Sequence, residues 1–145
     1  TLHANSANQA LDRTINSFPE ERRAQLLMDL SLNLKALVSQ RLLPMQEGKG
    51  RVAAVEVLLN TPLVADMIFK GEVGDIKELM KRSRELGMQT FDQALFDLYE
   101  TNMVTYEDAL RNADSVNDLR LQIKLNSKRA RTSDLASGTE HLTIV

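Results

Sequence analysis

The sequence predicts a mostly α-helical segment that carries one β-hairpin and, at its N-terminus, the short end of a further strand. Three observations support this fold class. Apolar residues recur with helical spacing over most of the chain, helix-capping residues precede most of these stretches, and only residues 40–62 combine apolar strand-like runs with a glycine-bearing turn. The 145 residues are enough for one domain with a hydrophobic core.

Composition narrows the class of protein. The formal net charge is -2, so the chain lacks the basic footprint of a general nucleic-acid binder. The absence of cysteine excludes disulfides, thiolate catalysis and zinc–thiolate sites, and it fits a cytoplasmic protein. No apolar run is long enough to cross a membrane. The chain begins at Thr1 rather than Met, and we expect it to be a piece of a longer protein.

The first residues predict a strand end followed by a helix. The run Thr1–Ala4 has the pattern of a strand end. Ser6 and Gln9 then have the spacing of a capping box, so Asn5 or Ser6 is expected to cap a helix. By spacing alone, a lone histidine such as His3 is more often a hydrogen-bonded structural residue than a catalytic one.

A second, longer helix is predicted next. Ser17 and Glu20 repeat the capping-box spacing around Pro19, which is favoured in a first helical turn. The apolar face of this helix is formed by Leu27, Leu30, Leu34, Leu37 and Val38. We therefore expect the helix to continue to Val38 and to be buried along one side.

Residues 40–62 predict the hairpin. Two apolar runs, Leu42–Leu43 and Val52–Leu59, flank the glycine-bearing loop Met45–Gly50. The second strand has almost no polar face, so we expect helices to cover both of its sides. Glu56 is the exception, and its carboxylate is expected at an opening or beside a basic group, more often in a structural role.

Helices are predicted again after the hairpin. Thr61 and Pro62 begin a short helix that Gly71 can end. The stretch Val73–Leu86 has one helical stripe and is closed by Gly87. Three further capped helix starts follow, at Thr90, Thr105 and Ser115.

The C-terminal part of the chain lacks a DNA-reading helix and then loses its apolar period. Two of the short helices have the spacing of a helix-turn-helix, but the second, YEDALRNAD, is acidic where a DNA-reading helix needs basic residues, so nucleic acid is not an expected partner. From Asn126 the apolar period stops, and residues 126–145 are expected to form a flexible tail. Its small basic cluster is expected to be solvated, with a membrane surface or a partner as the alternative.

The sequence contains no complete active site. There is no GxxxxGK[ST] phosphate loop, and Gly48–Gly50 is a turn between strands. HExxH, GxSxG and paired-histidine metal spacings are also absent, so no metal ligand is predicted.

Five runs of sequence together resemble one protein family. In chain order they are TLHANSA (1–7), FPEERR (18–23), LSLNLKALVSQRLL (30–43), GRVAAVEVLLNTP (50–62) and GMQTFDQAL (87–95). In this order and at these separations they resemble the C-terminal half of the PilU/PilT family, the secretion-type hexameric ATPases that power type IV pili. Within this family the runs are more similar to the PilU type than to the PilT type. The resemblance covers roughly residues 1–125.

The resemblance implies an α/β parent protein with a RecA-like P-loop ATPase core. Residues 1–60 would be the C-terminal part of that core, residues 61–125 a helical subdomain and residues 126–145 the tail. ATP and Mg²⁺ would be bound mainly by a preceding half with the phosphate loop. The resemblance also implies a homo-hexamer at the cytoplasmic face of the inner membrane, with a PilT-type retraction ATPase and an inner-membrane pilus platform protein as partners.

The same resemblance implies roles for three residues. TLHANSA resembles the family's histidine box, which makes His3 the catalytic candidate, expected near the terminal phosphate of ATP. Where PilT-like motors carry an AIRxLIR pattern, this chain has Leu63–Phe69 without either arginine. That departure favours the PilU type and puts independent retraction force in doubt. It makes Asp66 and Phe69 candidates for partner contact, with ordinary surface and core as the alternative.

Three functions stay open at this point. The first is part of an ATPase that powers pilus retraction and twitching motility as an accessory to PilT. The second is a pilus-assembly or type II secretion ATPase of the same superfamily, and the third is a non-enzymatic helical interaction module. The sequence preceding Thr1 separates the ATPases from the module, since only they need a phosphate loop there. The 145-residue segment alone is expected not to hydrolyse ATP.

Overall fold

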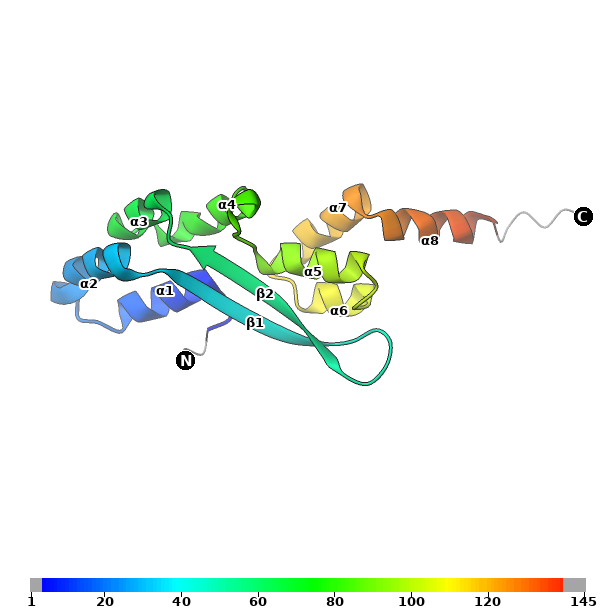
Figure 1. The fold of residues 1–145 in the computed structure, drawn as a ribbon, viewed down its shortest axis with the longest axis horizontal. Helices are drawn as coiled ribbons and strands as arrows, with labels where there is room; N and C mark the ends of the chain where they lie inside the picture. Colours follow the sequence, from blue (N-terminus) through cyan, green and yellow to red (C-terminus); the bar gives the residue numbers. More distant parts are fainter. Residues whose placement is uncertain (1–3, 140–145) are drawn as a thin grey trace, which may run out of the picture. The chain divides into compact units, whose positions relative to one another are not determined.

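The computed structural model describes residues 4–139, with side chains described as far as residue 133. Its elements, in chain order, are α1 (Ala7–Asn16), α2 (Glu20–Asn33), β1 (Ala36–Pro44), β2 (Arg51–Leu59), α3 (Pro62–Phe69), the 3₁₀ turn η1 (Val73–Asp75), α4 (Ile76–Lys81), the 3₁₀ turn η2 (Arg84–Leu86), α5 (Phe91–Glu100), α6 (Tyr106–Arg111), α7 (Val116–Asn126) and α8 (Lys128–Thr139). The strands form one two-stranded sheet, and the long hairpin is plain in Figure 1. The predicted mostly helical segment with a β-hairpin is confirmed. The predicted strand end at Thr1–Ala4 lies, apart from Ala4, outside the described residues.

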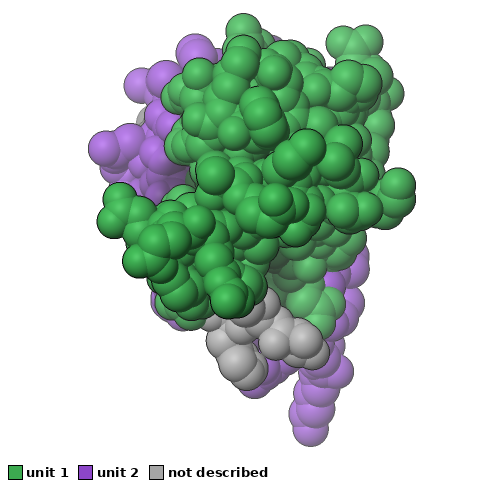
Figure 2. Space-filling view, turned by 90° about the vertical axis from the view of Figure 1, so that its left-hand side faces the viewer, with its two compact units in different colours: residues 1–41, 55–91 green, residues 42–54, 92–145 purple. Residues whose placement is uncertain are grey.

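The chain forms two compact units, which Figure 2 colours separately. Unit 1 lies within residues 1–41 and 55–91, and unit 2 within residues 42–54 and 92–145. Each strand of the hairpin therefore has residues in both units: β1 passes from unit 1 to unit 2 after Arg41, and β2 passes from unit 2 to unit 1 after Ala54. The predicted functional division at residues 60 and 125 stays a prediction, because compactness of the backbone does not test it.

Unit 1 has its own hydrophobic core. Helix α2 packs on α3, and α1 contacts both α2 and η1 (Figure 1). The buried cluster takes residues from α1, β2, α3, η1 and α4 and one residue from the segment between η2 and α5: Ala7, Leu11, Leu58, Val64, Ile68, Val73, Ile76, Met80 and Met88. Leu27 and Leu30 of α2 pack against this cluster as predicted, so the amphipathic pattern of the sequence correctly located much of this core.

The boundary between α2 and β1 differs from the sequence prediction. The helix ends at Asn33 instead of Val38, and β1 begins at Ala36. The Asn60 side-chain amide donates to the carbonyl oxygens of Ser31 (3.0 Å) and Leu34 (2.8 Å), which satisfies backbone acceptors at the helix end. Leu34 and Leu37 fit both a helical and a strand period, so the sequence does not show where the helix ends. The contact from Asn60, which follows β2, favours an end at Asn33. The predicted capping box at Ser17 is also wrong, because Pro19 precedes α2 without a side-chain cap.

The sequence predicted cover on both faces of the second strand, and in the structure one face is buried and the other is half-buried. Ala54, Glu56 and Leu58 on one face are buried, and the residues between them are half-buried. Val57 also forms an isolated antiparallel bridge with Gln89, so the segment before α5 is hydrogen-bonded to the strand. This bridge holds the start of α5 close to Glu56, which matters for the site described below.

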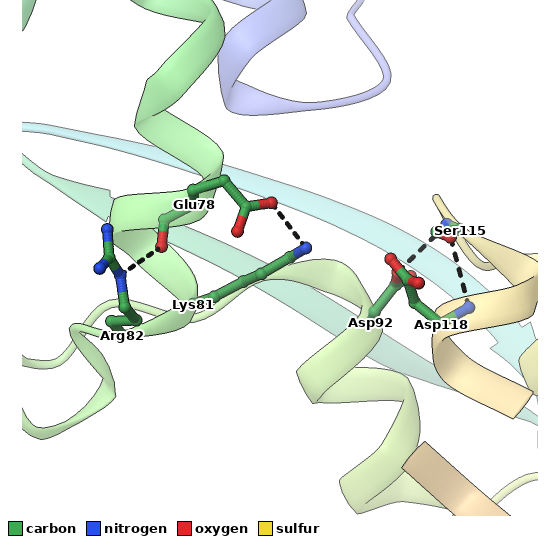
Figure 3. A network of polar contacts seen from close by, with 6 residues as sticks. All are labelled: Glu78, Lys81, Arg82, Asp92, Ser115 and Asp118. Carbon is green, nitrogen blue, oxygen red and sulfur yellow. Dashed lines mark hydrogen bonds and ion pairs between the residues drawn. The ribbon is translucent and has the colours of Figure 1, made fainter. Parts of the chain in front are cut away.

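The predicted single helix over Val73–Leu86 is broken into three pieces. Helix α4 covers only Ile76–Lys81, between the turns η1 and η2. The Ser83 hydroxyl donates to the carbonyl oxygen of Leu79 (2.7 Å), a local bond that competes with helix propagation. At the end of α4, the Glu78 carboxylate accepts a hydrogen bond from Lys81, and the Glu78 carbonyl oxygen accepts one from the side chain of Arg82 (Figure 3). Gly87 then ends η2 with φ of 95°, which glycine adopts without strain.

In unit 2 a carboxylate positions the loop between α6 and α7. Asp92, in the first turn of α5, accepts hydrogen bonds from the backbone N–H groups of Asp114 (2.8 Å) and Ser115 (3.1 Å). The Ser115 hydroxyl in turn accepts from the backbone N–H of Asp118 and caps α7 (Figure 3). The caps predicted at Thr105 and Ser115 are both confirmed.

The segment predicted as a flexible tail contains helix α8. Glu100 holds the beginning of this helix, since its carboxylate accepts from the Ser127 hydroxyl (2.6 Å) and from the backbone N–H of Lys128 (2.7 Å). The Arg129 guanidinium donates to the Tyr99 and Val104 carbonyl oxygens and lies 4.3 Å from the Tyr99 ring centroid. Sequence periodicity missed α8 because these contacts, and not an apolar face, anchor it.

Candidate functional site

The predicted catalytic residue, His3, lies outside the described residues, and Asn5 and Ser6 after it form the turn that leads into α1. The Ser6 hydroxyl accepts from the backbone N–H of Gln9 (3.2 Å), so the predicted cap of α1 is confirmed. The Gln9 side chain accepts from the backbone N–H of Asn5 (2.5 Å). Together these bonds give the turn between His3 and α1 a fixed backbone path from Asn5 onward.

The buried carboxylate of Glu56 also contacts this turn. Glu56 is only 2% exposed, and one of its carboxylate oxygens accepts from the backbone N–H of Ala7 at 2.7 Å. The other oxygen accepts from the backbone N–H of Phe91 at 3.4 Å. Burying a carboxylate requires such partners, because an unsatisfied charge away from water is costly. No sequence signal indicated these partners, which lie 49 and 35 residues away along the chain.

Arg41 of β1 contacts the same turn. Its guanidinium donates to the carbonyl oxygen of Asn5 at 2.7 Å and lies 4.0 Å from the centroid of the Phe91 ring. Asn5 and Ala7 are therefore held by side chains from both strands of the hairpin. We call this pair of side chains the Glu56–Arg41 clamp.

The two partner-contact candidates lie on α3, beside an apolar groove. Phe69 is 56% exposed, and Asp66 pairs with Lys70 at 2.8 Å. The hydrogen bond and the charge of Asp66 raise the pKa of Lys70. The groove has a volume of about 270 Å³ and is lined by residues of α2 and α3: Met28, Ser31, Leu32, Ala65, Asp66 and Phe69. We call it the α2–α3 groove.

The described part of the chain shows neither a metal centre nor a membrane span. Among the side chains that the structure describes, which end at residue 133, no group of three or more His, Cys, Asp or Glu is placed to hold a metal ion. None of the helices within residues 4–139 is both long and apolar enough to cross a bilayer.

No protein-family model matches the chain, but individual proteins do. It is 62% identical over 144 residues to the type IV pilus ATPase PilU of Pseudomonas aeruginosa, a match that covers 99% of this chain and 37% of that protein. It is 34% identical over 113 residues to the retraction ATPase PilT of the same organism, covering 78% of this chain and 33% of PilT. The chain thus spans about a third of the length of these relatives.

Comparison of the fold with solved structures identifies the same family of proteins. The crystal structure of the pilus retraction motor PilT with bound ADP superposes with a TM-score of 0.73 and 32% identity, over 83% of this chain and 33% of that one. Sequence and fold agree in both the proteins matched and the fraction of them covered. The chain therefore belongs to the PilU/PilT family of type IV pilus ATPases, of which it represents one segment.

Proposed function

We propose that the full-length protein is an ATPase that powers type IV pilus retraction and twitching motility, acting as a PilU-type accessory to PilT. The observation that carries the proposal is 62% identity to a PilU over 99% of this chain. The protein would work as a homo-hexamer at the cytoplasmic face of the inner membrane. Its partners would be a PilT-type ATPase and an inner-membrane pilus platform protein.

ATP and Mg²⁺ are the proposed cofactors. No described residue is assigned to hold either of them, and we propose that their ligands lie in the part of the full-length protein that this chain does not span. The chain's own contribution to the reaction would be His3, whose imidazole would contact the terminal phosphate or orient an acidic group there. Phosphoryl transfer depends mainly on such positioning and on charge stabilisation. This chain by itself has no phosphate loop and is expected to show no ATP turnover.

The role of His3 is tested in the purified full-length hexamer. His3→Ala is expected to lower kcat for ATP hydrolysis by about a hundredfold, a typical loss for a group that assists proton transfer or positioning. ATP affinity, measured by equilibrium binding, is expected to stay within about twofold of the parent, because the substitution removes an interaction made in the transition state. The matched control is His141→Ala, which removes the only other histidine of the chain. Unchanged turnover of the His3 variant would refute its catalytic role.

A further inference from the structure

We infer that Glu56 and Arg41 are positioning residues for the histidine box, through the backbone that follows His3. This inference rests on the proposed catalytic role of His3. The first step is that the clamp holds this backbone from two directions. Glu56 accepts the N–H of Ala7, and Arg41 donates to the carbonyl oxygen of Asn5, both at 2.7 Å.

Each member of the clamp also contacts Phe91. Glu56 is buried on the inner face of β2 and also accepts the N–H of Phe91. The Phe91 side chain is fully buried, and its ring supports the Arg41 guanidinium. A single aromatic residue thus contacts both arms of the clamp, one through its backbone and the other through its ring.

The carboxylate also suits the place where it binds. Ala7 is the first residue of α1, and the N–H groups at a helix start lack partners within the helix and carry partial positive charge. An ionised carboxylate is a stronger partner there than a neutral acceptor, and burial strengthens it further. Glu56 therefore fixes the start of α1 more firmly than the Ser6 cap alone.

Fixing Asn5 constrains His3 through the covalent chain. Only Ala4 separates Asn5 from His3 in the sequence, so the backbone that the clamp holds is covalently joined to the histidine through a single residue. In a positioned active site, a misplacement of about 1 Å costs as much as a hundredfold in rate. Loss of the clamp should therefore lower kcat while leaving nucleotide binding in place.

The test is a double-mutant cycle in the full-length hexamer. Glu56→Gln keeps the size of the side chain but removes the charge, and its amide can accept from only one of the two N–H groups. We expect Glu56→Gln to lower kcat about tenfold, with KM for ATP changed by less than about threefold. In the His3→Ala background the same substitution should have no further effect on kcat. Arg41→Lys, which loses the planar guanidinium, should show the same dependence on His3 with a smaller loss.

The matched control is Asp92→Asn in unit 2. Asp92 is likewise a carboxylate that accepts two backbone N–H groups, but it holds the α6–α7 loop instead of the histidine box. This variant should leave kcat within about twofold of the parent, and any loss should be independent of His3. If Glu56→Gln prevents folding, Arg41→Lys carries the test, because Arg41 bonds at the surface of the turn.

The outcomes separate this inference from the proposed function. A loss of kcat that is equal in the presence and absence of His3 would make Glu56 merely structural and overturn the inference. Full activity of Glu56→Gln and Arg41→Lys, alongside an inactive His3→Ala, would overturn it as well and leave the proposed function intact. Full activity of His3→Ala would refute the catalytic histidine and the inference with it.

Discussion

At the scale of single residues, three carboxylates act as backbone acceptors for distant segments. Glu56 binds the start of α1, Asp92 the loop before α7, and Glu100 the start of α8. Each accepts at least two N–H or O–H groups, and hydrogen bonds to an ionised carboxylate are stronger than those to a neutral acceptor. In each case the partner is more than twenty residues away in sequence, so these bonds stabilise tertiary structure and not local turns.

The pH dependence of α8 follows from Glu100. Its pKa is lowered from 4.5, first by the hydrogen bond from Ser127, against the opposing effect of burial, and then by the backbone N–H groups of Lys128 and Arg129 and the charge of Lys128. Because the folded-state pKa lies below that of the unfolded chain, the ionised carboxylate stabilises α8 fully above pH 4.5. This stabilisation is lost as the pH falls through the lowered value.

Amide hydrogen exchange across α8 checks this dependence. After correction for intrinsic rates, protection of residues 128–133 should be constant above pH 4.5 and fall as the pH is lowered further. Glu100→Gln should show weak protection, because a neutral amide is a weaker acceptor than a carboxylate. This protection should be the same at every pH, because the amide does not titrate. Equal protection of the parent and the variant at neutral pH would contradict the role assigned to Glu100.

At the scale of elements, side-chain caps determine where several helices begin. The Thr61 hydroxyl accepts from the backbone N–H of Val64 at 3.4 Å, and Pro62 occupies the first helical position of α3. Ser6, Thr105 and Ser115 cap α1, α6 and α7 in the same way. Each hydroxyl satisfies a donor that the helix itself leaves unpaired.

Removing the cap of α3 should destabilise unit 1 measurably. Thr61→Ala is expected to lower the free energy of unfolding by about 1 kcal/mol, the usual value of a threonine cap. The control is Thr14→Ala, since Thr14 lies inside α1 and its hydroxyl donates to the Ala10 carbonyl oxygen of the same helix. That control should change stability by less than about 0.5 kcal/mol. Urea denaturation of both variants measures the change in the free energy of unfolding. Equal losses of stability would show that the Thr61 cap contributes nothing specific.

The elements that could be predicted from sequence are those whose signals are local. The caps at Ser6, Thr61, Thr105 and Ser115 and the hairpin were predictable, because a capping hydroxyl or a glycine-bearing turn acts within a few residues. The end of α2, the break after α4 and the presence of α8 were not predicted. The first and last depend on Asn60 and Glu100, whose partners lie more than 25 residues away. The Glu56–Arg41 clamp was hidden for the same reason, whereas His3 was found by resemblance alone.

At the scale of the whole molecule, the chain leaves apolar surface exposed on unit 1. Phe69 and Leu32, which line the α2–α3 groove, are 56% and 67% exposed. Two large apolar side chains next to one groove favour a contact with another protein over a solvated surface. Asp66 lies in the same groove, and its ion pair with Lys70 is exposed enough to contribute little to stability. We propose that this surface binds the PilT-type ATPase, with Phe69 as its apolar anchor and Asp66 at its polar edge.

Phe69→Ala is therefore expected to weaken binding of the full-length protein to a PilT-type ATPase by about tenfold, since truncating an aromatic side chain that an interface buries typically costs more than about 1 kcal/mol. Asp66→Asn should weaken it less, because a charge at the edge of an interface mainly affects association rate. The control is Leu86→Ala, which truncates an apolar side chain that is 62% exposed in η2 and does not line the groove. The dissociation constant of each variant can be measured by analytical ultracentrifugation or surface plasmon resonance. ATP turnover of each variant confirms that it is folded. If the Phe69 and Leu86 variants bind equally well, the groove is ordinary surface, and the contact with PilT must be sought elsewhere in the protein.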